Sequence, residues 1–308
     1  MSDIALSVAR ILECTEQEYH ADPCDVPSLS NSIAVKMLNK SPLHGWAAHP
    51  KLGGSPGPAA VAEEGDDGEE EEGKPESTAA QKNGQLIHKL MLGKGVDVVI
   101  VDAKSFQTKY AKAIRDEALA AGKLPVIAHK HEKAEAVAAK LRRRCADAGY
   151  PLDGMSEVAI EWREAGDNGP VVCRCRMDNV SLETGVILDV KSSRDAHPDK
   201  CAKRLLEYGY DVQATCYPRA LAALRPELSG RIRFTLLYVE TTPPYAVVPA
   251  YLDGGFREIG KIRWLEAVRV WERCLASGVW PSYCERAVPL SPPAWVAAQW
   301  LGTEGATQ

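Results

Sequence analysis

Two aspartates and a lysine lie close together in the middle of the chain, in an arrangement that suits phosphate chemistry. The segments VVCRCRMDNV (171–180) and VILDVK (186–191) alternate apolar with polar residues, which is typical of β-strands. The residues between them favour a tight turn, so the two segments form a hairpin that sets Asp178 directly opposite Asp189. Lys191 projects from the same face of its strand as Asp189, because side chains repeat every second residue.

Facing carboxylates in a hairpin repel each other, so their presence calls for a physical reason. The Cβ atoms of directly opposed residues lie about 5 Å apart, and like charges at this separation destabilise a sheet. A divalent cation bridging Asp178 and Asp189 would remove the repulsion, and hard oxygen ligands favour Mg²⁺ or Mn²⁺. Lys191 could then hold a water or a phosphate oxygen beside the metal. The alternative is that both aspartates lie on a solvated face, where Lys191 offsets their charge.

The elements that would position these residues follow from the hydrophobic periodicity of the chain. Helices are predicted from Ser28 or Ser30 to Leu38, from Ser41-Pro42 onward, and at 84–92, 104–121, 130–147, 198–224 and 253–277. Strands are predicted at 155–162, 171–180, 185–192, 231–239 and 245–250. A mostly antiparallel sheet with one crossing helix makes a single domain of the α/β (α+β) class.

Four motifs, in this order along the chain, resemble those of the PD-(D/E)xK nuclease superfamily. They are GQLIH at 84–88, Asp178, the triplet DVK at 189–191, and QATCY at 213–217. The single acid and the acid-x-Lys triplet are similar to the superfamily pattern on adjacent strands. GxxxH and QxxxY are similar to two helix motifs of its RecB-type branch. Residues 27–280 as a whole resemble the nuclease domain of exonuclease VIII from phage and prophage recombination systems.

The resemblance implies a restriction-endonuclease-like core, in which a central mixed sheet is flanked by helices. It also implies that His88, Asp178 and Asp189 are metal ligands, for Mg²⁺ or alternatively Mn²⁺. Lys191 would be the catalytic lysine, which positions or deprotonates the attacking water. The middle acid of the family motif is often Glu, and Asp189 has one methylene less reach.

Three further residues belong to the predicted site or lie near it. Gln213 and Tyr217 occupy positions i and i+4 of one predicted helix. By resemblance they would orient the site or touch the substrate strand, whereas they could equally be interior polar groups that satisfy the sheet. Glu157, on the preceding strand, would either join the outer shell of the metal or simply face a sheet edge.

By resemblance the protein is a metal-dependent DNA exonuclease that hydrolyses linear double-stranded DNA from its ends, in the 5′-to-3′ direction. The resemblance also implies that the protein forms a ring-like homo-oligomer around DNA and that a single-strand annealing protein of homologous recombination is its partner. Two alternatives remain open. One is a nuclease of the same fold with single-strand or endonucleolytic specificity in defence or repair, and the other is a non-catalytic DNA-binding protein.

The net charge of −5 arises from one segment of the chain. Residues 63–76 hold nine acids and one lysine, a net of −8, so the 36 basic and 33 acidic residues that remain leave +3. Basic groups on that remainder, such as Arg142–Arg144, could track phosphates. The predicted organisation is an N-terminal helical part of the nuclease domain at 1–52, a disordered acidic insert at 53–82, the nuclease core at 83–280 and a C-terminal tail at 281–308.

The remaining composition predicts a cytoplasmic protein, and the resemblance to phage and prophage exonucleases implies the cytoplasm of a bacterium or of a phage-infected host. No apolar stretch approaches the roughly 18 residues that a membrane span needs. The N-terminus carries an acid where a signal peptide would be basic, and the nine cysteines show no disulfide spacing. Trp295 and Trp300 in the tail would dock either on the body of the protein or on a neighbouring subunit.

Overall fold

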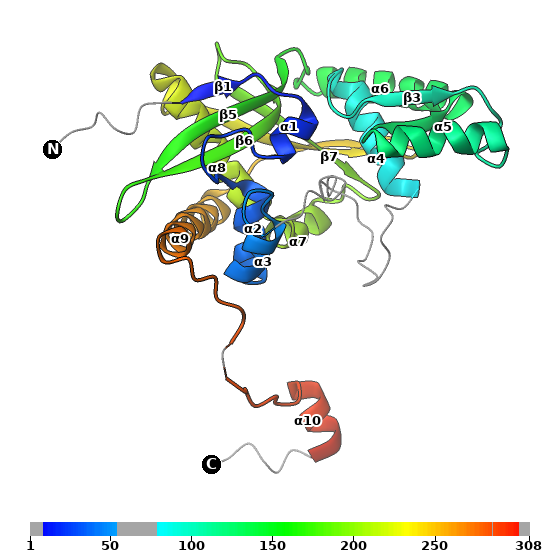
Figure 1. Cartoon of the computed structure of the whole chain (residues 1–308). Coiled ribbons are helices and arrows are strands. Elements are labelled where there is room, and N and C mark those ends of the chain that lie inside the picture. The colour runs from blue at the N-terminus through cyan, green and yellow to red at the C-terminus, as the bar shows by residue number, and fades with distance from the viewer. Residues whose placement is uncertain (1–8, 54–78, 285, 302–308) are drawn as a thin grey trace.

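A mixed β-sheet forms the centre of the protein in the computed structural model, which describes residues 9–53, 79–284 and 286–301 (Figure 1). In this described part the sheet has seven strands in the order β1-β5-β6-β7-β8-β9, with β2 paired to β6. The strands are β1 (Arg10–Leu12), β2 (Leu29–Ser30), β5 (Met155–Ala165), β6 (Pro170–Val180), β7 (Val186–Ser193), β8 (Arg233–Glu240) and β9 (Val247–Ala250). The predicted acidic insert falls almost wholly outside the described residues.

The sheet is mostly antiparallel, as the sequence predicts. Its exceptions are the parallel pairs β7–β8 and β2–β6. A parallel pair needs a crossover connection, and α7 (Pro198–Glu207) and α8 (Tyr210–Leu224) provide it between β7 and β8. The predicted fold class, a central mixed sheet flanked by helices, is therefore confirmed.

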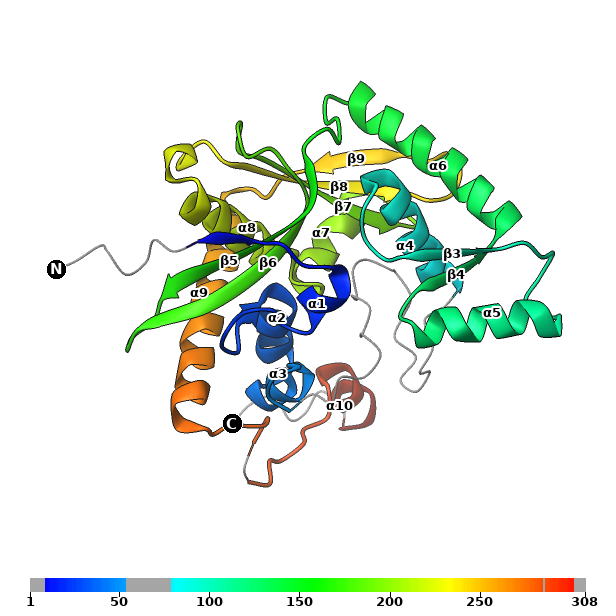
Figure 2. The same cartoon turned by 45° about the horizontal axis from the view of Figure 1, so that its top comes forward.

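Helices cover both faces of the sheet (Figure 2). On one face α2 (Asn31–Asn39), α8 and α9 (Gly254–Ser277) pack against β5, β6 and β7 in the largest hydrophobic cluster. On the other face α4 (Ala79–Leu92) and α6 (Ala128–Asp147) pack against β7 and β8 in a second cluster. β7 contributes apolar side chains to both clusters, so the strand that carries Asp189 and Lys191 lies at the centre of the fold.

Beside α4 and α6 lies a small second sheet that the sequence does not reveal. β3 (Val98–Val101) and β4 (Leu124–Ile127) pair in parallel, and α5 (Lys109–Ala120) connects them (Figure 1). The predicted helix at 104–121 therefore begins five residues later than expected, at Lys109, where Thr108 caps it. Runs of four apolar residues are too short for periodicity to separate strand from helix.

The N-terminal residues build a helical layer and also complete the sheet. Ser30 caps α2 by accepting a hydrogen bond from the Ile33 N–H, and Pro42 opens α3 (Pro42–Ala48), as the sequence predicts. A capping box formed by Thr15 and Glu18 starts the short α1 (Glu16–His20). β1 pairs with β5, so this layer is joined to the sheet through backbone hydrogen bonds.

The long helix predicted at 198–224 is broken into α7 and α8. Gly209 has φ 70°, in the left-handed region that glycine adopts without a steric cost. A Cβ atom at this position would lie 2.1 Å from Val35 Cγ2 on α2. The break therefore needs a glycine, both for the left-handed backbone and for the close contact with α2, although the apolar pattern of the local sequence continues through it.

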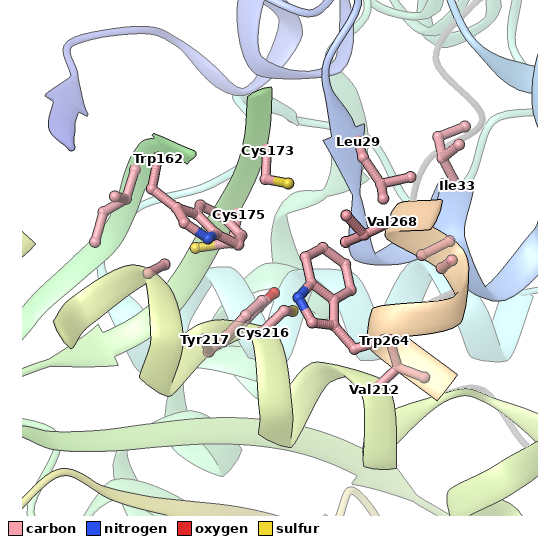
Figure 3. Close-up of a cluster of buried hydrophobic side chains, with 14 of the residues drawn as sticks. Leu29, Ile33, Trp162, Cys173, Cys175, Val212, Cys216, Tyr217, Trp264 and Val268 are labelled. Carbon is pink, nitrogen blue, oxygen red and sulfur yellow. The ribbon is translucent and has the colours of Figure 1, made fainter. Parts of the chain in front are cut away.

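A pair of stacked indoles lies at the centre of the largest cluster (Figure 3). The rings of Trp162 and Trp264 are 5.9 Å apart, and both indole N–H groups donate to Glu164 Oε1, at 2.9 and 3.2 Å. Arg219 also donates to this carboxylate, so the buried charge has a partner. Cys175 packs beside the indoles, and burial raises the pKa of its thiol.

Helices α8 and α9 approach each other so closely that one added methyl group between them should force them apart. A Cβ atom at Gly260 would lie 2.2 Å from the Asp211 carbonyl oxygen, whereas one at Gly255 would meet only Asp253 Oδ1, at 3.5 Å. We expect Gly260→Ala to lower the free energy of unfolding by about 2–3 kcal/mol, because overpacking outweighs the better helix propensity of alanine. Denaturant unfolding measures this, with Gly255→Ala as the control, and equal stabilities of the two variants would contradict the prediction.

The C-terminal tail carries α10 (Ala294–Leu301), which projects away from the sheet in Figure 1. Trp295 and Trp300 are 70% and 75% exposed, so neither indole is docked on the described body. Among the described residues, no helix combines the length and the apolar character that crossing a bilayer requires.

Candidate active site

The site lies where β6 and β7 separate. The predicted register is confirmed at Asn179↔Leu188 and Val180↔Ile187, and the ladder ends there, one residue before Asp178 and Asp189 would pair. The Asp178 carboxylate takes the place of the next backbone pairing, because its Oδ2 accepts a hydrogen bond of 2.7 Å from the Val190 N–H. Asp178 and Asp189 are thus opposite in register, but the backbone hydrogen bonds between β6 and β7 end before this pair, so the two residues are not paired in the ladder.

His88 contacts Asp178 from α4, which belongs to the helix layer that packs against β7 and β8. Its Nε2 lies 3.0 Å from Asp178 Oδ2. Burial acts to raise the pKa of the Asp178 carboxyl. His88, through its charge and hydrogen bond, and Lys191, through its charge, outweigh burial and hold that pKa below its usual value. Asp178 is therefore a carboxylate at neutral pH, which is the form that binds metal ions.

The glycine of the GxxxH motif allows α4 to lie this close to the sheet. A Cβ atom at Gly84 would lie 3.1 Å from Ser192 Oγ on β7, which is tighter than ordinary contact. His88 follows one turn later on the same helix, above the point where the strands part. The spacing of the motif thus has a packing reason, in addition to the side chain that it presents.

Glu157 completes a group of three possible metal ligands. One ligand atom each from His88, Glu157 and Asp178 can be chosen so that all lie within 4.8 Å of one another. Glu157 has φ 54°, a conformation that is costly for a residue other than glycine in a strand. Its carboxylate forms a 2.8 Å ion pair with Arg176 Nε. The left-handed backbone and the ion pair together place this carboxylate beside Asp178.

The sequence left the place of Glu157 open, although a signal for it exists. In the β5–β6 ladder, Ser156 pairs with Asn179 and Val158 with Met177, so Glu157 stands in register with Asp178. Pairing the predicted strands 155–162 and 171–180 in this register would have placed Glu157 opposite Asp178. The left-handed backbone of Glu157, in contrast, has no signature in the local sequence.

Asp189 and Lys191 form a second group on the other side of β7. Asp189 is fully buried; its Oδ1 accepts a 2.8 Å hydrogen bond from Gln213 Nε2, and Lys191 Nζ lies 2.7 Å from its Oδ2. Asp189 does not belong to the group formed by His88, Glu157 and Asp178. The predicted ligands therefore fall into two adjacent groups, and the positive charge of Lys191 in the second group helps to lower the pKa of Asp178 in the first.

Gln213 and Tyr217 occupy different environments despite their shared helix face. Gln213 contacts Asp189, as described above. Tyr217 lies in the large hydrophobic cluster (Figure 3). Its ring meets the Phe234 ring edge-on, with centroids 6.0 Å apart. The structure thus brings Gln213 to the site and places Tyr217 in the core; the site role predicted for Tyr217 stays a prediction.

The donor set fits a hard divalent cation. Carboxylate oxygens with one imidazole nitrogen suit Mg²⁺ or Mn²⁺ better than a soft, thiolate-binding metal. The cysteines of the described chain are free, and none joins the three-residue group. Asp178 contacts His88 and Glu157 pairs with Arg176, so each carboxylate of the group has a basic neighbour.

The structure is similar to a crystal structure named "putative exonuclease" from Eubacterium rectale, with 14% identity, a TM-score of 0.54, and coverage of 94% of this chain and 99% of that chain. A phage-related exonuclease from Haemophilus somnus 129PT is 14% identical, with a TM-score of 0.29, over 67% of this chain and 92% of that one. No curated protein matches the sequence.

Residues 70–290 match the family described as "PDDEXK-like domain of unknown function" (DUF3799). The matched range holds all four motifs and every residue of the two groups around β7. It also covers more than half of the chain. The chain therefore belongs to this PDDEXK-like family, and its fold is that of the PD-(D/E)xK nucleases.

Proposed function

We propose that the protein is a divalent-metal-dependent deoxyribonuclease that digests linear double-stranded DNA from its ends. The observation that supports this most strongly is the arrangement at the β6–β7 opening. A histidine and two carboxylates gather there within 4.8 Å, and a buried Lys–Asp pair adjoins them on β7. Phosphodiester hydrolysis needs stabilisation of anionic charge and a positioned water, and these two groups offer both.

His88, Glu157 and Asp178 would hold the metal, with Asp189 adjacent. When bound, Mg²⁺ or Mn²⁺ would supply Lewis-acid stabilisation of the phosphate and a lowered pKa of the attacking water. Lys191 would orient that water, and Gln213 would fix the carboxylate with which Lys191 pairs. The water oxygen bonds to phosphorus, the bond from phosphorus to the 3′ oxygen breaks, and the products are a 3′-hydroxyl and a 5′-phosphate.

The finer features are proposed from the resemblance of the sequence to exonuclease VIII. They are a 5′-to-3′ direction, a ring-like homo-oligomer around DNA, a single-strand annealing partner and a role in phage-type recombination. One structural feature agrees with contact to a phosphate backbone. Lys109, Lys112 and Arg115 lie along α5, in the lobe beside α4, and Lys109 and Lys112 are exposed.

Three DNA substrates of the same sequence test the proposed specificity: blunt linear duplex, linear duplex with 5′ overhangs, and covalently closed circle. With Mg²⁺, we expect loss of both linear forms and survival of the circle. Cutting of the circle would identify an endonuclease instead. Binding of all three forms without cutting of any would identify a non-catalytic DNA-binding protein.

Removing the charge of Glu157 tests the ligand group separately from catalysis. We expect Glu157→Gln to weaken Mn²⁺ binding about tenfold or more, because an anionic oxygen is lost from the three-residue group. Calorimetric titration of Mn²⁺ measures this. Glu16→Gln is the matched control, since Glu16 also contacts Arg176, at 3.3 Å, but lies outside the group. Equal Mn²⁺ affinities of the two variants would contradict the assignment of Glu157.

A further inference from the structure

The ammonium of Lys191 lies over an aromatic ring that none of the four motifs contains. Lys191 Nζ is 4.6 Å from the centroid of the Tyr210 ring and 2.7 Å from Asp189 Oδ2. The Lys191 side chain is only 2% exposed, so the ring and the carboxylate stand where water would otherwise solvate the charge. A cation within about 6 Å of a ring centroid is attracted by the ring quadrupole, and the attraction grows when water is excluded.

The break between α7 and α8 is what places this ring. Tyr210 is the first residue of α8, directly after Gly209, whose left-handed backbone and close contact with Val35 end the preceding turn. In a continuous helix from 198 to 224 the chain could not turn at this point. The break thus lets α8 run over β7 with its first turn against the catalytic lysine.

Residues one turn apart on α8 contact residues two positions apart on β7. Tyr210 covers Lys191, and Gln213, three residues later, bonds to Asp189, two residues earlier on β7. Positions i and i+3 of a helix share a face, as do positions i and i+2 of a strand, so the two pairs form one row of contacts. Tyr210 and Gln213 therefore act together on the two charged residues of the DVK triplet.

A second aromatic residue supports the ring from the sheet. Tyr238 on β8 is the register partner of Lys191 in the parallel β7–β8 ladder. Its ring meets Tyr210 edge-on, with centroids 6.4 Å apart, and both side chains are buried. The Tyr210 ring is therefore held between helix and sheet, and its position is fixed before any substrate arrives.

We propose that Tyr210 is a positioning residue for Lys191: its ring face holds the ammonium in the place from which it orients the attacking water. This inference rests on the proposed nuclease function. Tyr210 does not touch the reacting atoms in this account, so its removal should affect the rate of the chemical step and leave the binding of DNA unchanged.

Three variants test the proposal: Tyr210→Leu, which removes the ring, Tyr210→Phe, which keeps it, and Phe234→Leu, which removes another aromatic ring on the same face of the sheet. We expect Tyr210→Leu to lower kcat about tenfold with an unchanged KM, the size of effect expected for a desolvated cation–π contact. Tyr210→Phe should restore kcat to within about twofold of the wild type. Phe234→Leu should lower the unfolding midpoint without lowering kcat.

A second readout does not depend on activity. Limited acylation of lysines, followed by mass spectrometry, should modify Lys191 faster in Tyr210→Leu than in the wild type or Tyr210→Phe. If the wild-type enzyme is inactive but this pattern appears, the nuclease function fails while the aromatic support of Lys191 stands. If the enzyme is active, the proposal is overturned when Tyr210→Leu keeps wild-type kcat and acylation, or when Tyr210→Phe is as impaired as Tyr210→Leu.

Discussion

Asp178→Asn is expected to reduce Mg²⁺-dependent DNA hydrolysis by about a thousandfold or more, while the protein stays folded. The substitution removes an anionic oxygen from the group formed with His88 and Glu157, and metal-assisted stabilisation of a phosphate is worth several kcal/mol. The fold should survive because an amide oxygen can still accept the hydrogen bond that the Val190 N–H donates to Asp178.

The matched control for this variant is Asp195→Asn. Asp195 lies in the loop directly after β7 and pairs with Lys200 at the surface, so its substitution removes the same charge outside the group of possible metal ligands. Circular dichroism and thermal unfolding establish that both variants are folded, and digestion of labelled linear duplex compares their rates. Equal rates for Asp178→Asn and Asp195→Asn would show that the β6–β7 opening is not the active site.

Lys191→Met is expected to affect both activity and stability strongly. Asp189 is fully buried, and Lys191 is its charged partner. Removing one member of a buried ion pair leaves an uncompensated charge and typically costs about 3–5 kcal/mol. Loss of the positioned ammonium should also lower kcat by about a hundredfold or more, because a charge directed at the reacting phosphate stabilises the transition state.

The double variant Asp189→Asn/Lys191→Met separates these two effects. Neutralising both members of the pair removes the stranded charge, so we expect the free energy of unfolding to recover by about 2 kcal/mol or more relative to Lys191→Met. Activity should not recover, because the ammonium is still absent. Denaturant unfolding and digestion rates of the wild type and the variants provide both readouts. A double variant that is no more stable than Lys191→Met would contradict the buried pair described here.

The sequence predicts five strands of the main sheet, β5 to β9, because alternation and turn chemistry are local, whereas the short strands β1 and β2 were not predicted. The strands that carry Asp178 and Asp189 end within one or two residues of their predicted bounds, and their register is the one that a symmetric hairpin dictates. The order of the four motifs can also be read directly from the sequence, and the resemblance based on it agrees with the family match.

The opening of the hairpin could not be predicted in this way. Symmetric pairing would have set the carboxylates of Asp178 and Asp189 against each other, but the Val190 N–H and His88 bind Asp178 on one side while Gln213 binds Asp189 on the other. Of these partners, His88 comes from α4 and Gln213 from α8, which lie 90 residues from Asp178 and 24 residues from Asp189 along the chain. Charge repulsion is thus relieved by separating the strands, and two groups of site residues result in place of one.

Two local backbone conformations were also missed. The apolar pattern at 198–224 continues through Gly209, although this glycine ends the first helix in a left-handed conformation and lies against Val35 of α2. Glu157 adopts a left-handed conformation inside a strand whose residues favour extension. Both departures lie beside the site: the first brings Tyr210 over Lys191, and the second brings a carboxylate to His88.

The most direct test of the nuclease function is a single-turnover digestion of end-labelled linear duplex DNA by the purified wild-type protein, with Mg²⁺ or with EDTA, beside Asp178→Asn. We predict that the wild type releases 5′-phosphorylated products only with Mg²⁺ and that Asp178→Asn releases none above background. Cleavage that persists in EDTA, or that Asp178→Asn retains with Mg²⁺, would contradict a metal-dependent site at the opening between β6 and β7.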